Sequence, residues 1–217
     1  ADPRRLCWEA IRLARAVAAH PATAHPDADA LAATLLLHGA RLTGRHDAAG
    51  EIVPLPGQPR DRWDAGMVRM GMVHLQRAQA AAALSRWHLL AGIAAEHALA
   101  PDYVSTHWPR IIQYYELLMQ LDPSAPPRLG QAIALAEGGE PVRAEALLRA
   151  LLPRLPQALM AHVHAALAHV RQLQGDAAEA RGHLQQAVAL ARHEADRRLL
   201  QRRLDASAGE AGTVAGS

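Results

Sequence analysis

The sequence predicts an all-α fold, a right-handed solenoid of helical hairpins with about ten helices, and three observations predict it. Hydrophobic residues make up 50% of the 217 residues, but aromatic residues only 3%, with no Phe. The core must therefore consist mainly of Leu and Ala, which lead the helix-propensity scale. The alternation of Val, Ile, Thr and aromatic residues that marks strands is almost absent. Finally, one helical pattern recurs at nearly constant spacing.

The recurring segments begin at Ile111, Ala144 and Ala180, which are 33 and 36 residues apart, and Pro123 and Pro156 follow the first two. This spacing is close to the period of about 34 residues of tetratricopeptide repeats. Each helix pair in such an array has an apolar face that it cannot bury alone, so neighbouring pairs stack. The pattern therefore predicts tetratricopeptide-like repeats over residues 107–192.

The part before the repeats, residues 1–99, is expected to hold divergent helices. Apolar residues at helical spacing predict helices over 4–19, 27–42, 60–83 and 86–99. Asp61 and Ser85 stand where N-caps of the third and fourth helices are expected. Between the second and third helices, Thr43–Pro59 is rich in Gly and Pro and is predicted to be the longest irregular stretch.

The C-terminal part alternates regularly. A helix is expected to begin near Trp108, with Pro109 in its first turn. The further predicted helices cover 127–137, 141–152, 157–174 and 177–191, with turns at Gly138–Gly139 and Gly175–Asp176. A capping helix is expected over 193–206. The domain prediction is a single helical repeat domain over 1–206. Residues 207–217 are rich in Gly, Ala and Ser and are expected to be a disordered tail.

Charge and cysteine content argue against a dedicated nucleic-acid binder and against a disulfide-bonded protein. All 23 basic residues are Arg, and 21 acidic residues leave a formal net charge of +2, without the clustered basic stripe of dedicated nucleic-acid binders. The single cysteine, Cys7, excludes an internal disulfide and favours a reducing compartment. No apolar run approaches the roughly 20 residues that cross a bilayer. We expect a cytoplasmic protein without membrane contact, and a helix that begins almost at residue 1 indicates a piece of a longer protein.

The residues do not indicate an enzyme, a metal or a cofactor. The 13 histidines include no His-x3-His pair and no Cys-His cluster. His162 and His169 share a helix face but lie about 10 Å apart along it, too far to bind one ion. Cys7 has no His or carboxylate placed by sequence to activate it, so a structural thiol is the better interpretation. Nucleophile elbows, phosphate-binding Gly loops and dinucleotide fingerprints are absent from the sequence.

The better candidates are partner-binding residues. Exposed Trp and Arg are common anchors of protein interfaces, but Trp in a chain without Phe is also the bulky core residue. We expect about two of Trp63, Trp87 and Trp108 to be mostly buried. His162 and His169 are expected to line the inner face of the repeat array. The candidate partner-binding residues are Arg62, Trp63, Asp64, Trp108, His162 and His169.

Eight stretches of the sequence occur in the order found in one bacterial protein family. They are Leu6–Arg15, Leu35–Arg41, Gly50–Val53, Arg60–Asp64, Gly92–His97, Trp108–Tyr115, Arg128–Ala136 and Arg197–Leu204. Together they resemble the C-terminal tetratricopeptide-like extension of extracytoplasmic-function (ECF) RNA polymerase sigma factors. The chain departs from that family at Leu55–Pro59, where the family has an acidic loop, and at Gly130, where it has Asn.

The resemblance implies a regulatory protein–protein interaction domain that modulates transcription initiation. Its implied partners are the sigma-factor core domains, RNA polymerase or a regulatory protein. Promoter DNA would be bound only through sigma domains that this chain lacks. The alternative is a free-standing tetratricopeptide adaptor or a small-ligand sensor that uses the groove inside the array.

Overall fold

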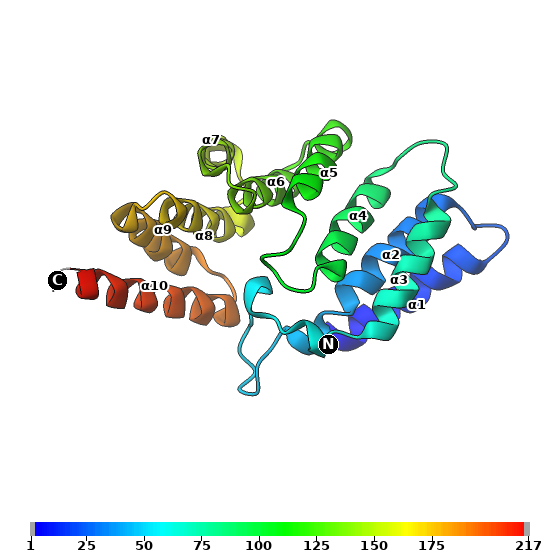
Figure 1. The fold of residues 1–217 in the computed structure, drawn as a ribbon, viewed down its shortest axis with the longest axis horizontal. Helices are drawn as coiled ribbons and strands as arrows, with labels where there is room; N and C mark the ends of the chain where they lie inside the picture. The colour runs from blue at the N-terminus through cyan, green and yellow to red at the C-terminus, as the bar shows by residue number, and fades with distance from the viewer. Residues whose placement is uncertain (1–2, 215–217) are drawn as a thin grey trace. The chain divides into compact units, whose positions relative to one another are not determined.

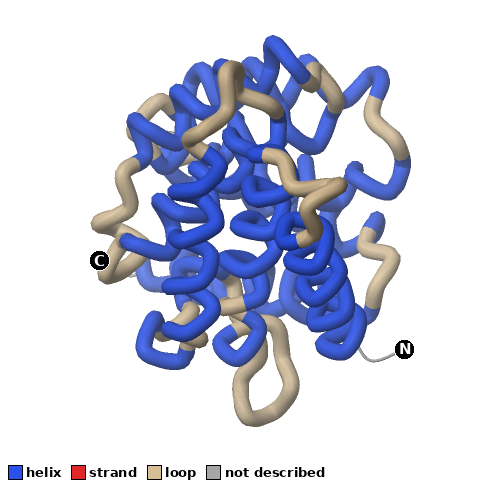
Figure 2. Tube along the Cα trace, turned by 90° about the vertical axis from the view of Figure 1, so that its right-hand side faces the viewer, coloured by secondary structure: helices blue, strands red, loops and turns tan. Residues whose placement is uncertain are grey.

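The computed structural model describes residues 3–214, with Pro3 and residues 209–214 described by their backbone alone. Helices joined by loops make up this part of the chain, and it contains no β-strand (Figure 2). The ten helices are α1 (Pro3–Ala19), α2 (Pro26–Gly39), α3 (Ala65–Ala78), α4 (Arg86–Leu99), α5 (Trp108–Leu121), α6 (Ala125–Glu137), α7 (Pro141–Leu151), α8 (Gln157–Leu173), α9 (Ala177–Leu190) and α10 (Glu194–Val214). The predicted all-α class and hairpin arrangement are confirmed.

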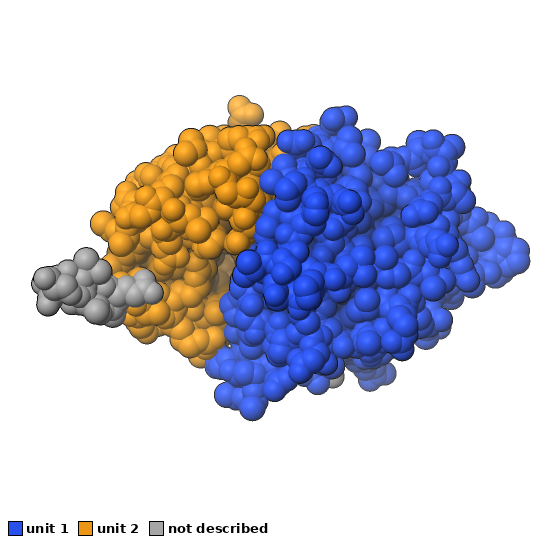
Figure 3. Space-filling view, in the orientation of Figure 1, with its two compact units in different colours: residues 1–122 blue, residues 123–217 orange. Residues whose placement is uncertain are grey.

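The chain forms two compact units, residues 1–122 and residues 123–217 (Figure 3). Unit 1 contains α1 to α5, and unit 2 contains α6 to α10. The boundary at Asp122 lies inside the range predicted for the repeats. Each unit has its own buried apolar residues, and each is described separately below.

Helix α2 lies at the centre of unit 1 and packs against α1, α3 and α4 (Figure 1). Its neighbouring residues Leu36 and Leu37 are both fully buried, although they point in directions about 100° apart on a helix. Leu36 packs with Ile11 of α1 and Met67 of α3, whereas Leu37 packs with Ala94 of α4. Because α2 is surrounded in this way, its small and apolar composition suits burial on several sides.

The α2–α3 connection contains short 3-10 turns at Leu42–Gly44, Leu55–Gly57 and Arg60–Arg62. Helix α3 begins at Ala65, not at residue 60, because the Oδ1 of Asp64 accepts a hydrogen bond from the backbone N–H of Met67 at 2.9 Å. The predicted N-cap Asp61 was therefore wrong. The predicted end at residue 83 was also wrong: the helix stops at Ala78, and the alanines that follow are largely exposed and contribute little packing.

Unit 2 repeats one hairpin twice, as α6–α7 and α8–α9. Both turns contain a glycine with positive φ, Gly139 at 87° and Gly175 at 80°. After each glycine, a backbone N–H bonds to the carbonyl five residues earlier: Glu140 to Leu135 at 2.8 Å, and Asp176 to Arg171 at 2.9 Å. This is the Schellman bond that ends a helix at a left-handed residue. The predicted equivalence of the two turns is confirmed.

The recurring positions predicted from spacing are buried. Ile111 of α5, Ala144 of α7 and Ala180 of α9 are each at most 1% exposed. Leu148 and Leu184, four residues further on in α7 and α9, are fully buried. A small residue followed one turn later by a large one lets neighbouring helices approach and interlock. Spacing in the sequence therefore identified the contact positions.

Helix α10 packs against α9, with Leu200 in contact with Ala187 and Ala191. It continues to Val214, eight residues beyond the expected end near Ala206. The rest of the expected tail, residues 215–217, lies outside the described residues. Within the described helices, none combines the length and the apolar composition that crossing a lipid bilayer requires.

Two helical glycines should respond in opposite ways to a side chain. A Cβ at Gly71 of α3 would lie 2.8 Å from Cγ of Leu37, whereas a Cβ at Gly182 of α9 would meet nothing within 4 Å. Gly71→Val should lower the free energy of unfolding by about 1–3 kcal/mol through overpacking. Gly182→Ala should raise it by about 0.5–1 kcal/mol, since Ala is the better helix former. Urea unfolding measures both, and equal effects would contradict the packing described for α2 and α3.

Candidate functional site

Two arginines, two tryptophans and a histidine gather in unit 1, and we call them the arginine–tryptophan cluster (Arg41, Arg60, Trp63, His97 and Trp108). The cluster draws on four segments: the residues after α2, the 3-10 turn before α3, α4 and the start of α5. Each segment contributes a residue with a large or charged side chain. The cluster thus joins parts of the chain that are up to 67 residues apart.

The indole of Trp63 is the ring on which both arginines of the cluster lie, and this residue is 7% exposed. The Cζ of Arg60 lies 4.1 Å from the centroid of its ring, and the Cζ of Arg41 lies 5.4 Å from it. In a 3-10 turn, residues three apart lie above one another, which places Arg60 over Trp63. Both guanidiniums are therefore within cation–π range of one indole.

Hydrogen bonds fix the loop that carries Arg60 and Trp63. The Nε of Arg41 donates to Oε1 of Gln58 at 3.3 Å, and Nε2 of Gln58 donates to the carbonyl of Val53 at 2.8 Å. The hydroxyl of Thr43 donates to the carbonyl of Arg62. The buried Gln58 thus connects the end of α2 to the irregular segment and holds it beside the cluster.

Aromatic contacts complete the other side of the cluster. The indole of Trp108 is 8% exposed. His97 meets it edge-on at 5.4 Å between ring centroids, and Tyr103 meets it edge-on at 5.1 Å. Such T-shaped contacts are a preferred geometry for aromatic pairs. Trp108 therefore acts in unit 1 as a packing centre for α4 and the α4–α5 loop.

Burial and like charge weaken the ionised states in this cluster. Burial, with Arg45 and Arg60 nearby, lowers the pKa of Arg41 to about 10. Burial, followed by the positive charges of Arg41 and Arg60, lowers the pKa of His97 to about 4. Burial also lowers the pKa of Arg60, although Asp102 opposes that shift. At neutral pH the two arginines are charged and His97 is neutral.

Several donors of the cluster are buried without an acceptor. The three guanidinium nitrogens of Arg60, Nε1 of Trp63 and Nδ1 of His97 are shielded from solvent and make no hydrogen bond within the described residues. Buried polar atoms in proteins are hydrogen-bonded in the large majority of cases. Unit 1 therefore concentrates unmet hydrogen-bonding capacity and positive charge at one place.

The neutral state of His97 predicts a pH-dependent stability. A histidine whose pKa falls on folding stabilises the fold fully above its unfolded pKa of about 6.5, and this stability is lost as the pH falls toward about 4. Lowering the pH from 7.5 to 5 should cost wild type about 1–2 kcal/mol more than it costs His97→Gln. Denaturant unfolding of both proteins at the two pH values measures this difference, and an identical pH dependence would contradict the buried, neutral ring.

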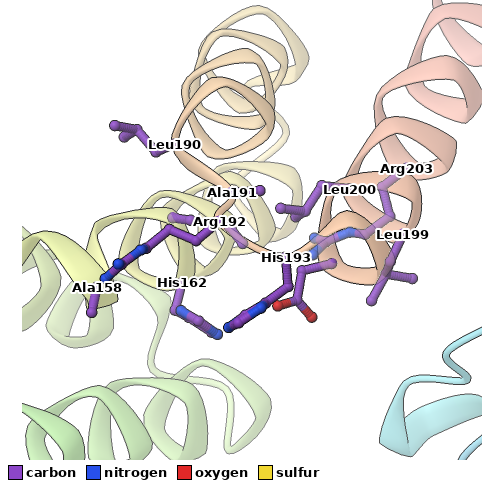
Figure 4. A pocket seen from close by; sticks show the side chains of 12 residues that line it. Ala158, His162, Leu190, Ala191, Arg192, His193, Leu199, Leu200 and Arg203 are labelled. Carbon is purple, nitrogen blue, oxygen red and sulfur yellow. The ribbon is translucent and has the colours of Figure 1, made fainter.

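Unit 2 contains a separate cavity of about 230 Å³ among the start of α8, the end of α9 and the start of α10 (Figure 4). Its apolar wall includes Ala158, Leu199 and Leu200. The rings of His162 and His193 point toward one another there (Figure 4). The cavity is also lined by Ala161, Ala165, Leu190, Ala191, Arg192, Asp196 and Arg203. Burial lowers the pKa of Arg203. The wall is therefore mainly apolar, with basic side chains and the carboxylate of Asp196.

An ion-pair network joins α7, α8 and α9. Glu145 pairs with Arg149 at 2.6 Å and with Arg171 at 3.3 Å, and Glu179 pairs with both arginines. Every charge of this network has an opposite partner, unlike those of the arginine–tryptophan cluster. We regard the network as structural, because each member already bridges neighbouring helices.

The described residues contain no group of three or more His, Cys, Asp or Glu side chains that could hold a metal ion. Nδ1 of His164 lies 3.1 Å from Nδ1 of His183, but this pair lacks a third such ligand. Burial raises the pKa of the Cys7 thiol, which opposes formation of the thiolate nucleophile.

The six predicted partner-binding residues fall into two groups. In unit 1, Trp63 and Trp108 belong to the arginine–tryptophan cluster, Asp64 caps α3, and Arg62 is exposed beside them. In unit 2, His162 is exposed at the cavity. His169 points elsewhere and bonds through Nε2 to Glu137 at 2.8 Å. His162 and His169 therefore have different surroundings in the structure.

Sequence reasoning missed the charged half of the cluster. It selected Arg62, whereas Arg60 is the arginine that stacks on Trp63. The spacing of three residues between Arg60 and Trp63 was the available signal, but it is informative only when the segment is recognised as a 3-10 turn. The sequence did not predict that Arg41 and His97 lie close together. Their proximity arises from the packing of α2 against α4.

Comparison with known proteins places the chain near proteins whose roles are not described. Residues 2–79 match the model of a family of unknown function (DUF6596). An uncharacterized protein of Rhizobium meliloti (strain 1021) is 32% identical over 210 residues, which are 97% of this chain and 49% of the relative. The chain thus spans about half the length of that curated relative. No solved structure matches the chain.

Proposed function

We propose that the chain is a regulatory protein-binding domain of an ECF-type RNA polymerase sigma factor and modulates transcription initiation. One observation carries the proposal. Four of the stretches that resemble the sigma-factor extension, Leu35–Arg41, Arg60–Asp64, Gly92–His97 and Trp108–Tyr115, each contribute to the arginine–tryptophan cluster. Stretches that are dispersed along the chain but meet at one place are more readily explained by a shared site than by chance.

The nature of that site favours binding over catalysis. It combines arginines and tryptophans, the residue types that dominate the binding energy of protein interfaces. It also leaves buried donors without acceptors, which a partner could satisfy. The matched relative is about twice as long as the aligned region, so it has room for further domains such as the sigma core that the proposal requires.

The regulated partner would be the sigma core, RNA polymerase or a regulatory protein. The experiment is co-purification of tagged residues 1–217 with the sigma core encoded upstream of them and with RNA polymerase. Retention of either supports the proposal. An upstream sequence without sigma domains, or a chain that retains neither component, would count against it.

The cavity of unit 2 favours a second candidate, a small-ligand sensor. A volume of about 230 Å³ with apolar walls, basic groups and one carboxylate suits a small amphipathic molecule. A start codon immediately before Ala1 would support this free-standing role, whereas an open reading frame that encodes sigma domains before Ala1 would support the first proposal.

A further inference from the structure

We propose that the arginine–tryptophan cluster is a binding site for an oxyanion group, a phosphate or a carboxylate, held mainly by Arg60. The inference does not depend on a role in transcription, because it rests on the chemistry of the cluster itself. It assigns a ligand class to buried groups that the packing of unit 1 leaves without partners.

The first step concerns the available donors. A guanidinium has five N–H donors in a planar fork, and all three nitrogens of Arg60 are buried without an acceptor. Trp63 adds one N–H at Nε1, and neutral His97 adds one in the tautomer protonated at Nδ1. All of these groups can donate, and the arginine fork matches the paired oxygens of carboxylate and phosphate.

The second step concerns the acceptors nearby, which are engaged with other donors. Oδ1 of Asp102 accepts from the backbone N–H of Ser105 at 2.7 Å. Oε1 of Gln58 accepts from Arg41, and Oε1 of Glu96 accepts from Arg110 at 3.1 Å. Within the described residues, Arg60 therefore has no hydrogen-bonded acceptor, although the charge of Asp102 acts on it.

The third step concerns charge. Arg41 and Arg60 both lie over the ring of Trp63, at 5.4 and 4.1 Å, so two like charges share one partly buried site. The ring face attracts cations but supplies neither a full negative charge nor acceptor lone pairs. Asp102 supplies a negative charge near Arg60 but no hydrogen bond to it. An oxyanion in contact with the guanidinium supplies both, and its negative charge would offset the repulsion between the two guanidiniums.

Access to the site is through the loop that carries it. Arg60 and Trp63 lie on the irregular connection between α2 and α3, which is held by turn and side-chain hydrogen bonds and not by the repeated bonds of a helix. Irregular segments open locally at a smaller cost than core helices do. A ligand can therefore reach the buried donors by displacing this loop, without unfolding the helices of unit 1.

The test is binding of inorganic phosphate, sulfate and succinate to the chain of residues 1–217, measured by titration calorimetry and by thermal unfolding. Sodium chloride at matched ionic strength is the reference. At least one oxyanion should bind saturably and raise the unfolding temperature beyond the chloride reference. Arg60→Gln should weaken that binding by at least about tenfold, because a charge-assisted bond is lost. The exposed neighbour Arg62→Gln should bind as wild type does.

A second variant keeps the test decisive if Arg60→Gln does not fold. Trp63→Phe retains a ring under the arginines but removes the Nε1 donor, and it should weaken binding by about two- to tenfold. Preference for phosphate would identify a phosphorylated ligand, and preference for succinate a carboxylate. Absence of any saturable effect beyond chloride, or equal binding by wild type, Arg60→Gln and Trp63→Phe, would overturn the proposal.

Discussion

Replacing Ala180 by Arg is expected to unfold the α8–α9 hairpin and to lower the free energy of unfolding by at least about 3 kcal/mol. Ala180 is 1% exposed in α9, which packs between α8 and α10. The larger side chain alone costs about 1–3 kcal/mol through overpacking, and the burial of an unpaired charge adds to that cost. Circular dichroism and urea unfolding measure the loss.

The matched control is Ala178→Arg, two residues earlier in the same helix. Ala178 is exposed, so a long polar side chain there can extend into solvent. Its effect should remain within about 0.5 kcal/mol, as for most surface substitutions. If Ala180→Arg melted like this control, the assignment of Ala180 to the repeated contact position would be wrong.

Leu36→Ala is expected to have the second large effect and acts on unit 1. Leu36 is fully buried in α2, where it packs with Ile11 and Met67. Removing a buried leucine side chain leaves a cavity and costs about 2–5 kcal/mol. Denaturant unfolding should show a lower midpoint with little change in slope.

Leu6→Ala provides the comparison for this substitution. Leu6 lies in α1 of the same unit, but its side chain is 68% exposed. The same chemical change should therefore cost less than about 0.5 kcal/mol there. Equal losses for Leu6→Ala and Leu36→Ala would mean that α2 is not the centre of the unit 1 core.

The helices were largely predictable because their signals are local. Ser85 caps α4 through a capping box with His88, and the helix spans Arg86–Leu99 as predicted. The repeated turns at Gly139 and Gly175 were identified because glycine tolerates the positive φ that ends these helices. Hydrophobic periodicity, together with Gly and Pro residues that interrupt helices, therefore predicted the order of most helices.

The start of α3 was less predictable, since two aspartates compete for one role. Asp61 and Asp64 are both suitable N-caps by residue type. The outcome depends on the 3-10 turn at Arg60–Arg62, where the N–H of Trp63 bonds to the carbonyl of Arg60. That turn delays the α-helix until Asp64. Propensity alone does not separate such alternatives, because a long-range bond from the Thr43 hydroxyl to the carbonyl of Arg62 helps to hold the turn.

The candidate site was predictable only in part. The tryptophans at 63 and 108 were identified as burial or binding candidates, and both are buried in one cluster. The roles of Arg41 and His97 follow from the packing of α2 and α4, which periodicity does not specify. The pairing of residues from separate helices is a tertiary property, and the periodicity of a single sequence does not reveal it.

The arginines of the two units differ in their partners, and this difference supports the functional proposal. In unit 2, Arg149 and Arg171 are paired with Glu145 and Glu179. In unit 1, the guanidinium of Arg60 stacks on an aromatic ring and lacks a hydrogen-bonded partner. Paired charges stabilise contacts between helices, whereas buried guanidinium nitrogens without an acceptor are costly unless a ligand binds them. The arginine–tryptophan cluster is therefore where we expect regulation to act.

Transcription by the complete protein tests the regulatory role most directly. For the sigma factor that we propose, the measurement compares run-off transcription from a cognate promoter by RNA polymerase with the complete protein, with a form that lacks residues 1–217, and with complete Arg60→Gln. The account predicts a changed transcript yield for the deletion and a change in the same direction for Arg60→Gln, while Arg62→Gln resembles wild type. Equal yields from the full-length and deleted proteins would contradict it.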